Sequence, residues 1–221
     1  MASRAAPLRQ IRERELVAAT RALFDERGMQ DAPVEEIAQA AGIARGLIYR
    51  HFSSRDELYM LTVTDYLREL AGELEAAVAK SEDPVVQLER CTEAFAGYCE
   101  RYPAFLDSSL ALMRGPARTL QESVSESVWL RLGQGMARCL DCLASILRRG
   151  SKAGLFEIDD PDYMANVLWT QALGLMHLAR IRVGVRQVAP GVPELFPVAP
   201  EQAVRTCVAS SMATVGGAKR R

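Results

Sequence analysis

Apolar residues recur at helical spacing along most of the chain, whereas sustained apolar–polar alternation bounded by turn residues is not found. The first segment with helical spacing predicts a helix over residues 8–27. Its apolar positions are Ile11, Leu16, Ala19, Leu23 and Phe24. Gly28 is expected to end this helix in a left-handed conformation, which glycine adopts without steric cost.

Two short helices follow, over residues 34–41 and 44–51, with a tight turn between them. Pro33 suits the first turn of the earlier helix because its missing N–H would be unpaired there. Gly42 breaks the pattern between the two helices. A long helix then runs from Ser54 to about residue 80, and Ser54 and Glu57 have the S-x-x-E spacing of a capping box.

The rest of the chain predicts a second, larger helical region. Its expected helices cover residues 83–101, 103–113, 120–150, 161–185 and 201–215. Residues 154–161 and 189–200 are expected to be loops, and the second of these segments holds four prolines and a glycine. The pattern therefore predicts an all-α protein of about nine helices, with a disordered tail over residues 216–221.

Composition and charge narrow the functional classes. The 221 residues are 49% hydrophobic and 25% charged, as in ordinary globular proteins, and the formal net charge is -1. Any nucleic-acid contact must therefore come from a local cluster of basic residues. The N-terminal residues lack the apolar stretch of a signal peptide, and the most apolar segment, residues 167–179, is short and interrupted by polar residues. We expect a cytoplasmic protein with no membrane partner.

Five cysteines are present, an odd number that does not indicate a disulfide framework. Cys139 and Cys142 form a C-x-x-C sequence, which is compatible with metal or redox chemistry. It lies inside a helical pattern, however, and the chain has no second C-x-x-C and only two histidines. We interpret these cysteines as small apolar residues of a helix and expect no metal and no cofactor.

The two short helices have the form of a helix-turn-helix. The segment from Ile37 to Tyr59 reads I-A-Q-A-A-G-I-A-R-G-L-I-Y-R-H-F-S-S-R-D-E-L-Y. Positions spaced to face a small core are Ile37, Ala38, Ala41, Ile43, Ile48 and Phe52. Positions that then point outward are Arg45, Gly46, Leu47, Tyr49 and Arg50. Such a face suits the major groove, because arginine can bond guanine edges and small or apolar groups can touch a thymine methyl.

This segment resembles the TetR family, whose signature runs roughly I-A-x-x-A-G-V-S-x-G-x-[LIF]-Y-x-[HY]-F-x-[SN]-K-x-x-L. Residues 22–28, A-L-F-D-E-R-G, also resemble the end of the family's first helix. The sequence departs from the signature at Ala44, where serine or threonine is usual, and at Leu47, where threonine or serine is common. Arg55 replaces the common lysine and keeps the charge.

The resemblance implies an N-terminal three-helix DNA-binding domain, residues 1–53, and a helical ligand-binding and dimerisation domain, residues 54–215. By analogy, base-edge contacts fall to Arg45, Gly46 and Leu47. Phosphate contacts fall to Tyr49, Arg50, His51, Ser54 and Arg55. Arg4 and Arg9 would touch the backbone from an N-terminal arm or be plain solvated residues. The alternatives for Tyr49 and His51 are a half-buried aromatic and an exposed histidine without a role.

The resemblance also implies a ligand pocket in the C-terminal domain and a dimer formed by the last two long helices. Candidate pocket residues are Tyr98, Phe105, Met113, Trp129, Met136, Trp169 and His177. Each of them is also compatible with an ordinary core position, and His177 with a core or dimer-interface position. Candidate dimer-interface residues are Met164, Leu168, Gln171, Leu175, Val204 and Val208. The alternative for this stripe is an ordinary buried helix.

Together these features predict a ligand-responsive transcriptional repressor that binds a palindromic operator as a homodimer. A small, hydrophobic effector would release it from double-stranded DNA. An enzyme is the first alternative, but G-x-S-x-G, H-E-x-x-H, P-loop and G-x-G-x-x-G motifs are missing from the sequence. The second alternative is a protein-interaction module whose helix-turn-helix no longer binds DNA. The outward-pointing basic residues argue against this alternative.

Overall fold

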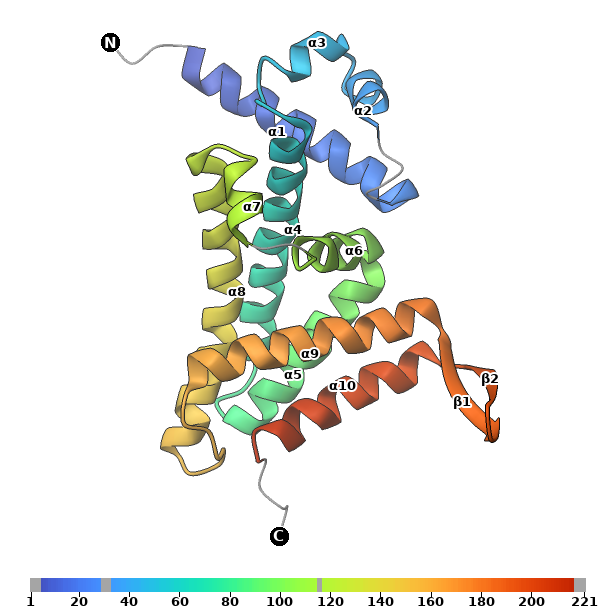
Figure 1. The fold of residues 1–221 in the computed structure, drawn as a ribbon. Coiled ribbons are helices and arrows are strands. Elements are labelled where there is room, and N and C mark those ends of the chain that lie inside the picture. The colour runs from blue at the N-terminus through green and yellow to red at the C-terminus, as the bar shows by residue number, and fades with distance from the viewer. Residues whose placement is uncertain (1–4, 29–32, 115–116, 217–221) are drawn as a thin grey trace. The chain divides into compact units, whose positions relative to one another are not determined.

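A computed structural model describes residues 5–28, 33–114 and 117–216 (Figure 1). Within these ranges the chain forms ten helices and one two-stranded antiparallel sheet. The chain divides into two compact units. The first contains the chain up to Arg68 together with residues 102–136, and the second contains residues 69–101 and the chain from Ala137 onward. The predicted all-helical class is confirmed, with one helix more than expected.

The first unit holds the N-terminal helices and the early parts of two long ones. Its helices are α1 (Ala5–Arg27), α2 (Val34–Ala40), α3 (Arg45–Ile48), α6 (Pro103–Leu112), α7 (Ala117–Glu122) and the first parts of α4 (Arg55–Val78) and α8 (Glu126–Lys152). Tyr66 lies in its core and donates a hydrogen bond to Asp25 at 2.6 Å. The guanidinium of Arg21 lies over the Tyr66 ring, 4.2 Å from its centre, and pairs with Asp65 at 2.8 Å. These contacts hold α1 against α4.

The second unit contains the remaining parts of α4 and α8, together with α5 (Pro84–Arg101), α9 (Pro161–Ile181) and α10 (Pro200–Thr214). Helix α10 packs along α9 and against α5, as Figure 1 shows for α9 and α10. The ring of Trp169 meets that of Phe95 edge-on, with 4.9 Å between their centres. In α8, Gly150 lies directly against the ring of Phe156, which leaves no space for a larger side chain there.

A β-hairpin connects α9 to α10 where the sequence pattern predicted a helix end and a loop. Strand β1 (Val183–Ala189) pairs with β2 (Val192–Pro197), and Arg186 forms an ion pair with Glu194 across them at 2.7 Å. Helix α9 ends at Ile181 because Arg182 adopts a left-handed conformation, with φ of 56°. Prolines are tolerated in β2 because each strand of a two-stranded sheet is an edge strand.

Three further expectations about the helices were wrong. The helix predicted over residues 120–150 is two helices, because the Ser123 hydroxyl donates to the backbone carbonyl of Leu120 in the turn between α7 and α8. Helix α3 ends at Ile48, and single hydrogen-bonded turns continue the chain to Phe52. Ile11, predicted on the apolar side of α1, is 51% exposed. Most of the predicted tail, residues 217–221, lies outside the described residues.

Candidate functional site

The turn between α2 and α3 has the hydrogen bonding of a Schellman motif. Gly42 is left-handed, with φ of 65°. The N–H of Ile43 donates to the carbonyl of Ala38 at 2.9 Å, and the N–H of Gly42 donates to that of Gln39 at 3.0 Å. Glycine suits this position because other residues pay a steric cost for a positive φ. The turn therefore fixes the direction in which α3 leaves α2.

A small core below the turn decides which side of α3 faces solvent. Ile37, Ile48 and Phe52 are each at most 1% exposed, and Ala38 is also buried. The side chains on the opposite side are exposed: Arg45, Gly46, Leu47, Tyr49 and Arg50. The predicted split between core and outward positions therefore agrees with the burial of these residues, except that Ala41 and Ile43 are only half-buried.

Helix α3 lacks a side-chain cap at its start. Ala44 occupies the capping position in an extended conformation and offers no acceptor to the free N–H groups. Serine or threonine at this position normally accepts such a bond and stabilises the helix by about 1 kcal/mol. The weak start, together with the tightened hydrogen bonds after Ile48, accounts for the shortness of α3.

Two of the predicted DNA-contacting arginines have partners within the protein. Arg45 forms an exposed ion pair with Glu35 of α2 at 3.0 Å, a contact that spacing along one helix does not reveal. Arg55 lies over the ring of Tyr59, 4.5 Å from its centre. Exposed ion pairs contribute at most about 1 kcal/mol, and exposed cation–π contacts about 0.5–1 kcal/mol, so neither contact holds its guanidinium group strongly.

The start of α4 is built around the buried carboxylate of Glu57. Ser54 accepts a hydrogen bond from the Glu57 N–H at 3.1 Å, as the capping box predicts. In a capping box the Glu57 side chain would accept a bond from the N–H of Ser54. Here Glu57 Oε2 accepts instead from the N–H of Ser53, at 2.7 Å. Its Oε1 accepts from the N–H of Ser125 at the start of α8, at 2.9 Å. Burial raises the pKa of Glu57, but the bonds from Ser125 and Ser53 outweigh it, so the pKa lies below its usual value.

The remaining predicted DNA-contacting residues are placed as follows. His51 is half-buried, and its Nδ1 is buried with no hydrogen-bond partner among the described residues. Ser54 is half-buried at the start of α4. Arg4 and the side chain of Arg9 lie outside the described part of the chain.

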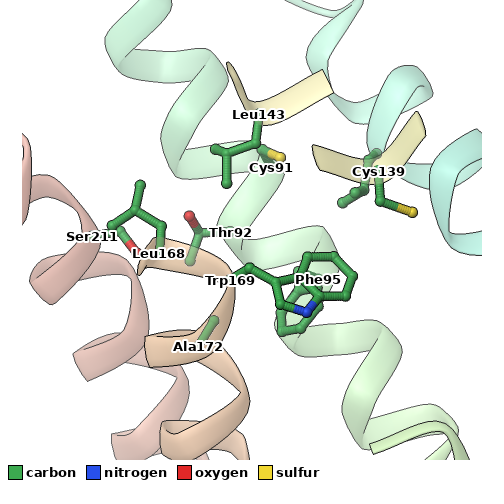
Figure 2. A pocket seen from close by; sticks show the side chains of 10 residues that line it. Cys91, Thr92, Phe95, Cys139, Leu143, Leu168, Trp169, Ala172 and Ser211 are labelled. Carbon is green, nitrogen blue, oxygen red and sulfur yellow. The ribbon is translucent and has the colours of Figure 1, made fainter. Parts of the chain in front are cut away.

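An apolar cavity lies inside the second unit (Figure 2). Its volume is about 30 Å³. Its walls come from α4, α5, α8, α9 and α10: Leu74, Cys91, Thr92, Phe95, Cys139, Leu143, Leu168, Trp169, Ala172 and Ser211. No charged side chain is among these residues, and Thr92 and Ser211 supply the hydroxyl groups. The wall chemistry therefore favours neutral, mainly apolar molecules.

The structure brings only one of the seven predicted pocket residues, Trp169, to this cavity. Tyr98 and Phe105 are fully buried core residues, whereas Met113 is 51% exposed at the end of α6. His177 is exposed on α9. Helical periodicity identified large apolar residues but did not distinguish a cavity wall from a filled core.

Trp129 and Met136 are half-buried on α8 in the first unit. That unit has a hollow of its own, of about 200 Å³, between α4, α6 and α7. It is lined by Asp56, Tyr59, Met60, Val63, Ser108, Ala111, Leu112 and Leu120. None of the predicted pocket residues lines this hollow.

The candidate dimer-interface residues lie on α9 and α10. Leu168 is 3% exposed and lines the cavity, so it faces the interior of the unit and not its surface. Half-buried positions are Met164, Gln171, Leu175, Val204 and Val208. A shallow groove runs along α9 and includes Gln171, Val167 and Gly174. The stripe thus has one inward-facing member and five that retain exposed surface.

The fold and its motif define a structural class, the helical proteins that carry a helix-turn-helix near the N-terminus. Residues 16–60 match the family model described as bacterial regulatory proteins, tetR family. This match covers α2, α3 and the adjoining parts of α1 and α4, so the chain is similar to this family over these residues. Within the part of the chain that the structure describes, no helix is long and apolar enough to cross a membrane.

Curated relatives are similar in the N-terminal region. The HTH-type transcriptional regulator BetI of Brucella anthropi is 36% identical over 74 residues, which cover 34% of this chain and 38% of that protein. The HTH-type transcriptional activator FasR of Mycolicibacterium smegmatis is 32% identical over 89 residues, which cover 40% of this chain and 41% of that protein. The matched regions thus span well under half of these relatives, which are named as regulators and not as enzymes.

Solved structures resemble the chain along nearly its whole length. RolR in complex with resorcinol has a TM-score of 0.69 at 18% identity, covering 96% of this chain and 91% of that one. The TetR family regulator PfmR of Thermus thermophilus has a TM-score of 0.60 at 25% identity, covering 94% of this chain and 100% of that one. Both C-terminal regions therefore share a helical fold with this chain, while their sequences have diverged.

Proposed function

We propose that the protein is a transcriptional regulator that reads a palindromic operator through α3. The observation that carries this proposal is the exposed row on α3 above a buried core, on a rigid Schellman turn. Arg45 can reach guanine edges, Leu47 can contact a thymine methyl, and Gly46 allows close approach of the backbone. Tyr49 and Arg50 are placed to bind phosphates, which supply sequence-independent affinity.

A homodimer follows from the geometry of DNA reading. Two helix-turn-helix heads enter successive major grooves when they are about 34–36 Å apart, which requires two copies related by a two-fold axis. The exposed face of α9, with Tyr163 68% exposed, is the proposed centre of the contact. The hairpin that follows α9 exposes Val185 and Leu195 side by side, both more than 60% exposed. An apolar face on a two-stranded sheet gains stability when a partner covers it.

We further propose that a small effector occupies the apolar cavity and that the protein acts as a repressor. Leu74 lines this cavity and belongs to α4, the helix whose first turn follows the DNA-reading residues. A ligand that changes the position of α4 would favour a second arrangement of the reading heads, and release follows from the different operator affinities of the two states. The aromatic walls, Phe95 and Trp169, favour a neutral aromatic or aliphatic effector.

The test is selection of duplexes from a random pool at a stated salt concentration. The wild type is compared with the double variant Tyr49→Ala, Arg50→Ala. The matched control is Arg118→Ala, which removes the same charge from an exposed site on α7. We expect the wild type and the control to enrich one inverted repeat, and the double variant to lose it.

Equal enrichment by all three proteins would refute DNA reading through α3. If none of the three proteins enriches any DNA sequence, the result favours the alternative of an interaction protein that does not bind DNA.

A further inference from the structure

Three of the five cysteines gather beside the cavity of the second unit. Cys91 belongs to α5, whereas Cys139 and Cys142 lie one turn apart on α8. Cys91 and Cys139 both line the cavity, as Figure 2 shows. The thiols of Cys91 and Cys142 are hydrogen-bonded to each other, and both cysteines are free. The C-x-x-C sequence thus meets a third thiol from another helix.

The two hydrogen-bonded thiols differ in accessibility and acidity. Cys91 is buried, whereas Cys142 retains exposed surface. The hydrogen bond from Cys91 lowers the pKa of Cys142, which favours its thiolate. The same bond, together with burial, raises the pKa of Cys91 well above its usual value. A more acidic, accessible thiol next to a buried one is the arrangement of an attacking and a resolving cysteine.

The other cysteines lack this arrangement. Burial raises the pKa of Cys99, that of Cys139 to about 12 and that of Cys207 to about 11, so all three favour the unreactive thiol form. Among the described residues, no group of three cysteine, histidine or carboxylate side chains is suited to hold a metal ion. Redox chemistry therefore fits the Cys91–Cys142 pair better than metal binding does.

We propose that Cys142 and Cys91 are a redox-active pair that a hydroperoxide oxidises to a reversible disulfide between α8 and α5. The Cys142 thiolate attacks the terminal oxygen of the hydroperoxide, the O–O bond breaks, and the alkoxide (hydroxide when the oxidant is hydrogen peroxide) takes up a proton. Cys142 is then a sulfenic acid. The sulfur of Cys91 attacks the Cys142 sulfur, the S–O bond breaks, and the departing hydroxide leaves as water with the Cys91 proton.

The disulfide would act on the cavity itself. Cys91 lines it directly, and Cys142 is adjacent in sequence to the lining residue Leu143. A covalent bond between α5 and α8 pulls two walls of the cavity together, because bonded sulfurs are about 2 Å apart and hydrogen-bonded thiols are farther apart. The inference about the disulfide is independent of DNA binding, so the two proposals can fail separately.

The experiment uses the full chain, reduced and then exposed to hydrogen peroxide. Remaining thiols are blocked with N-ethylmaleimide under denaturing conditions, and the digested protein is analysed by mass spectrometry. We expect a cross-linked peptide pair containing Cys91 and Cys142, restored to free thiols by dithiothreitol. One disulfide consumes two thiols, so the number of blockable thiols should fall from five to three.

Three variants sharpen the result. Cys142→Ser and Cys91→Ser should each abolish the cross-link, and Cys91→Ser should leave Cys142 as a sulfenic or sulfinic acid. The matched control, Cys207→Ser, removes a buried thiol of α10 and should keep the cross-link. A cross-link between Cys139 and Cys142, or five thiols that all stay reduced in the folded wild type, would overturn the proposal. These wild-type outcomes remain decisive even where a variant does not fold.

Discussion

Replacing Glu57 by Gln tests whether its buried carboxylate holds the start of α4 in place. The carboxylate accepts two backbone hydrogen bonds, from Ser53 at 2.7 Å and from Ser125 at 2.9 Å. Glutamine retains one oxygen and presents an NH₂ group to the other N–H, so one bond is lost and one donor is left unpaired. Hydrogen bonds to charged groups contribute about 1.5–3 kcal/mol each. We therefore expect Glu57→Gln to lower the free energy of unfolding by about 2 kcal/mol at pH 7.

The effect should depend on pH in a defined direction. The pKa of Glu57 is lowered in the folded protein, so its stabilising contribution is fully present above the unfolded pKa, for which 4.5 is the reference value. This contribution is lost as the pH falls through the folded pKa. Glutamine does not titrate, so the difference between wild type and variant should narrow as the pH is lowered from about 6 toward 3.

Urea unfolding followed by far-ultraviolet circular dichroism measures both quantities. The matched control is Glu75→Gln on the same helix, where an exposed carboxylate pairs with Arg138 at 2.6 Å. Exposed pairs contribute about 0–1 kcal/mol, so this variant should be nearly neutral. The reasoning fails if Glu57→Gln costs no more than the control at pH 7, or if its cost stays constant as the pH falls.

Other substitutions test the packing of single positions, each by the shift in the urea midpoint. Gly150→Ala should cost about 1–3 kcal/mol because its Cβ would overlap the Phe156 ring, whereas Gly133→Ala on the same helix has open space and should gain about 0.5–1 kcal/mol. Equal effects of the two would contradict the packing of Phe156. Ala44→Ser should stabilise by about 0.5–1 kcal/mol by capping α3, and no gain would show that the start of α3 is satisfied otherwise. Gly42→Ala should cost about 1–2 kcal/mol because φ is 65°, and an unchanged midpoint would refute the strained turn.

Local sequence rules predicted the helix-turn-helix well because its determinants lie close together in the chain. Gly42 as the turn residue and the burial of Ile37, Ile48 and Phe52 follow from spacing alone. The ion pair of Arg45 with Glu35 did not follow, because it joins two helices across a turn whose angle the pattern does not specify. The bond from Ser125 to Glu57 spans 68 positions and is likewise invisible to local patterns.

The hairpin sequence carries a strand and turn signal of its own. Valines alternate with other residues at positions 183 and 185, and Pro190 and Gly191 form a typical turn pair. The four prolines of residues 189–200 favoured a loop instead. In a two-stranded sheet, however, each strand has one side that makes no ladder hydrogen bonds. A proline whose nitrogen faces that side costs no hydrogen bond. Proline content therefore excludes a central strand but not a hairpin.

The cavity residues were the hardest to predict because a cavity depends on what the packing leaves unfilled. Trp169 was identified by its size, whereas the small wall residues Thr92, Ala172 and Ser211 carry no signal of their own. Leu168 was assigned to the dimer interface from its place in the apolar stripe of α9. This stripe is broader than a single interface, and its residues on one side face the interior of the unit. Leu168 is one of these residues.

The size of the cavity bears on how an effector would act. At about 30 Å³ it has space for roughly two or three water molecules, since one water needs roughly 10–15 Å³. An aromatic effector would therefore have to displace wall side chains, and Leu74 of α4 is one of them. A ligand shifts an equilibrium only by its difference in affinity for the two states. A cavity that admits the ligand only after α4 has moved makes that difference large, whereas a pocket that is already open would bind the same ligand without moving α4.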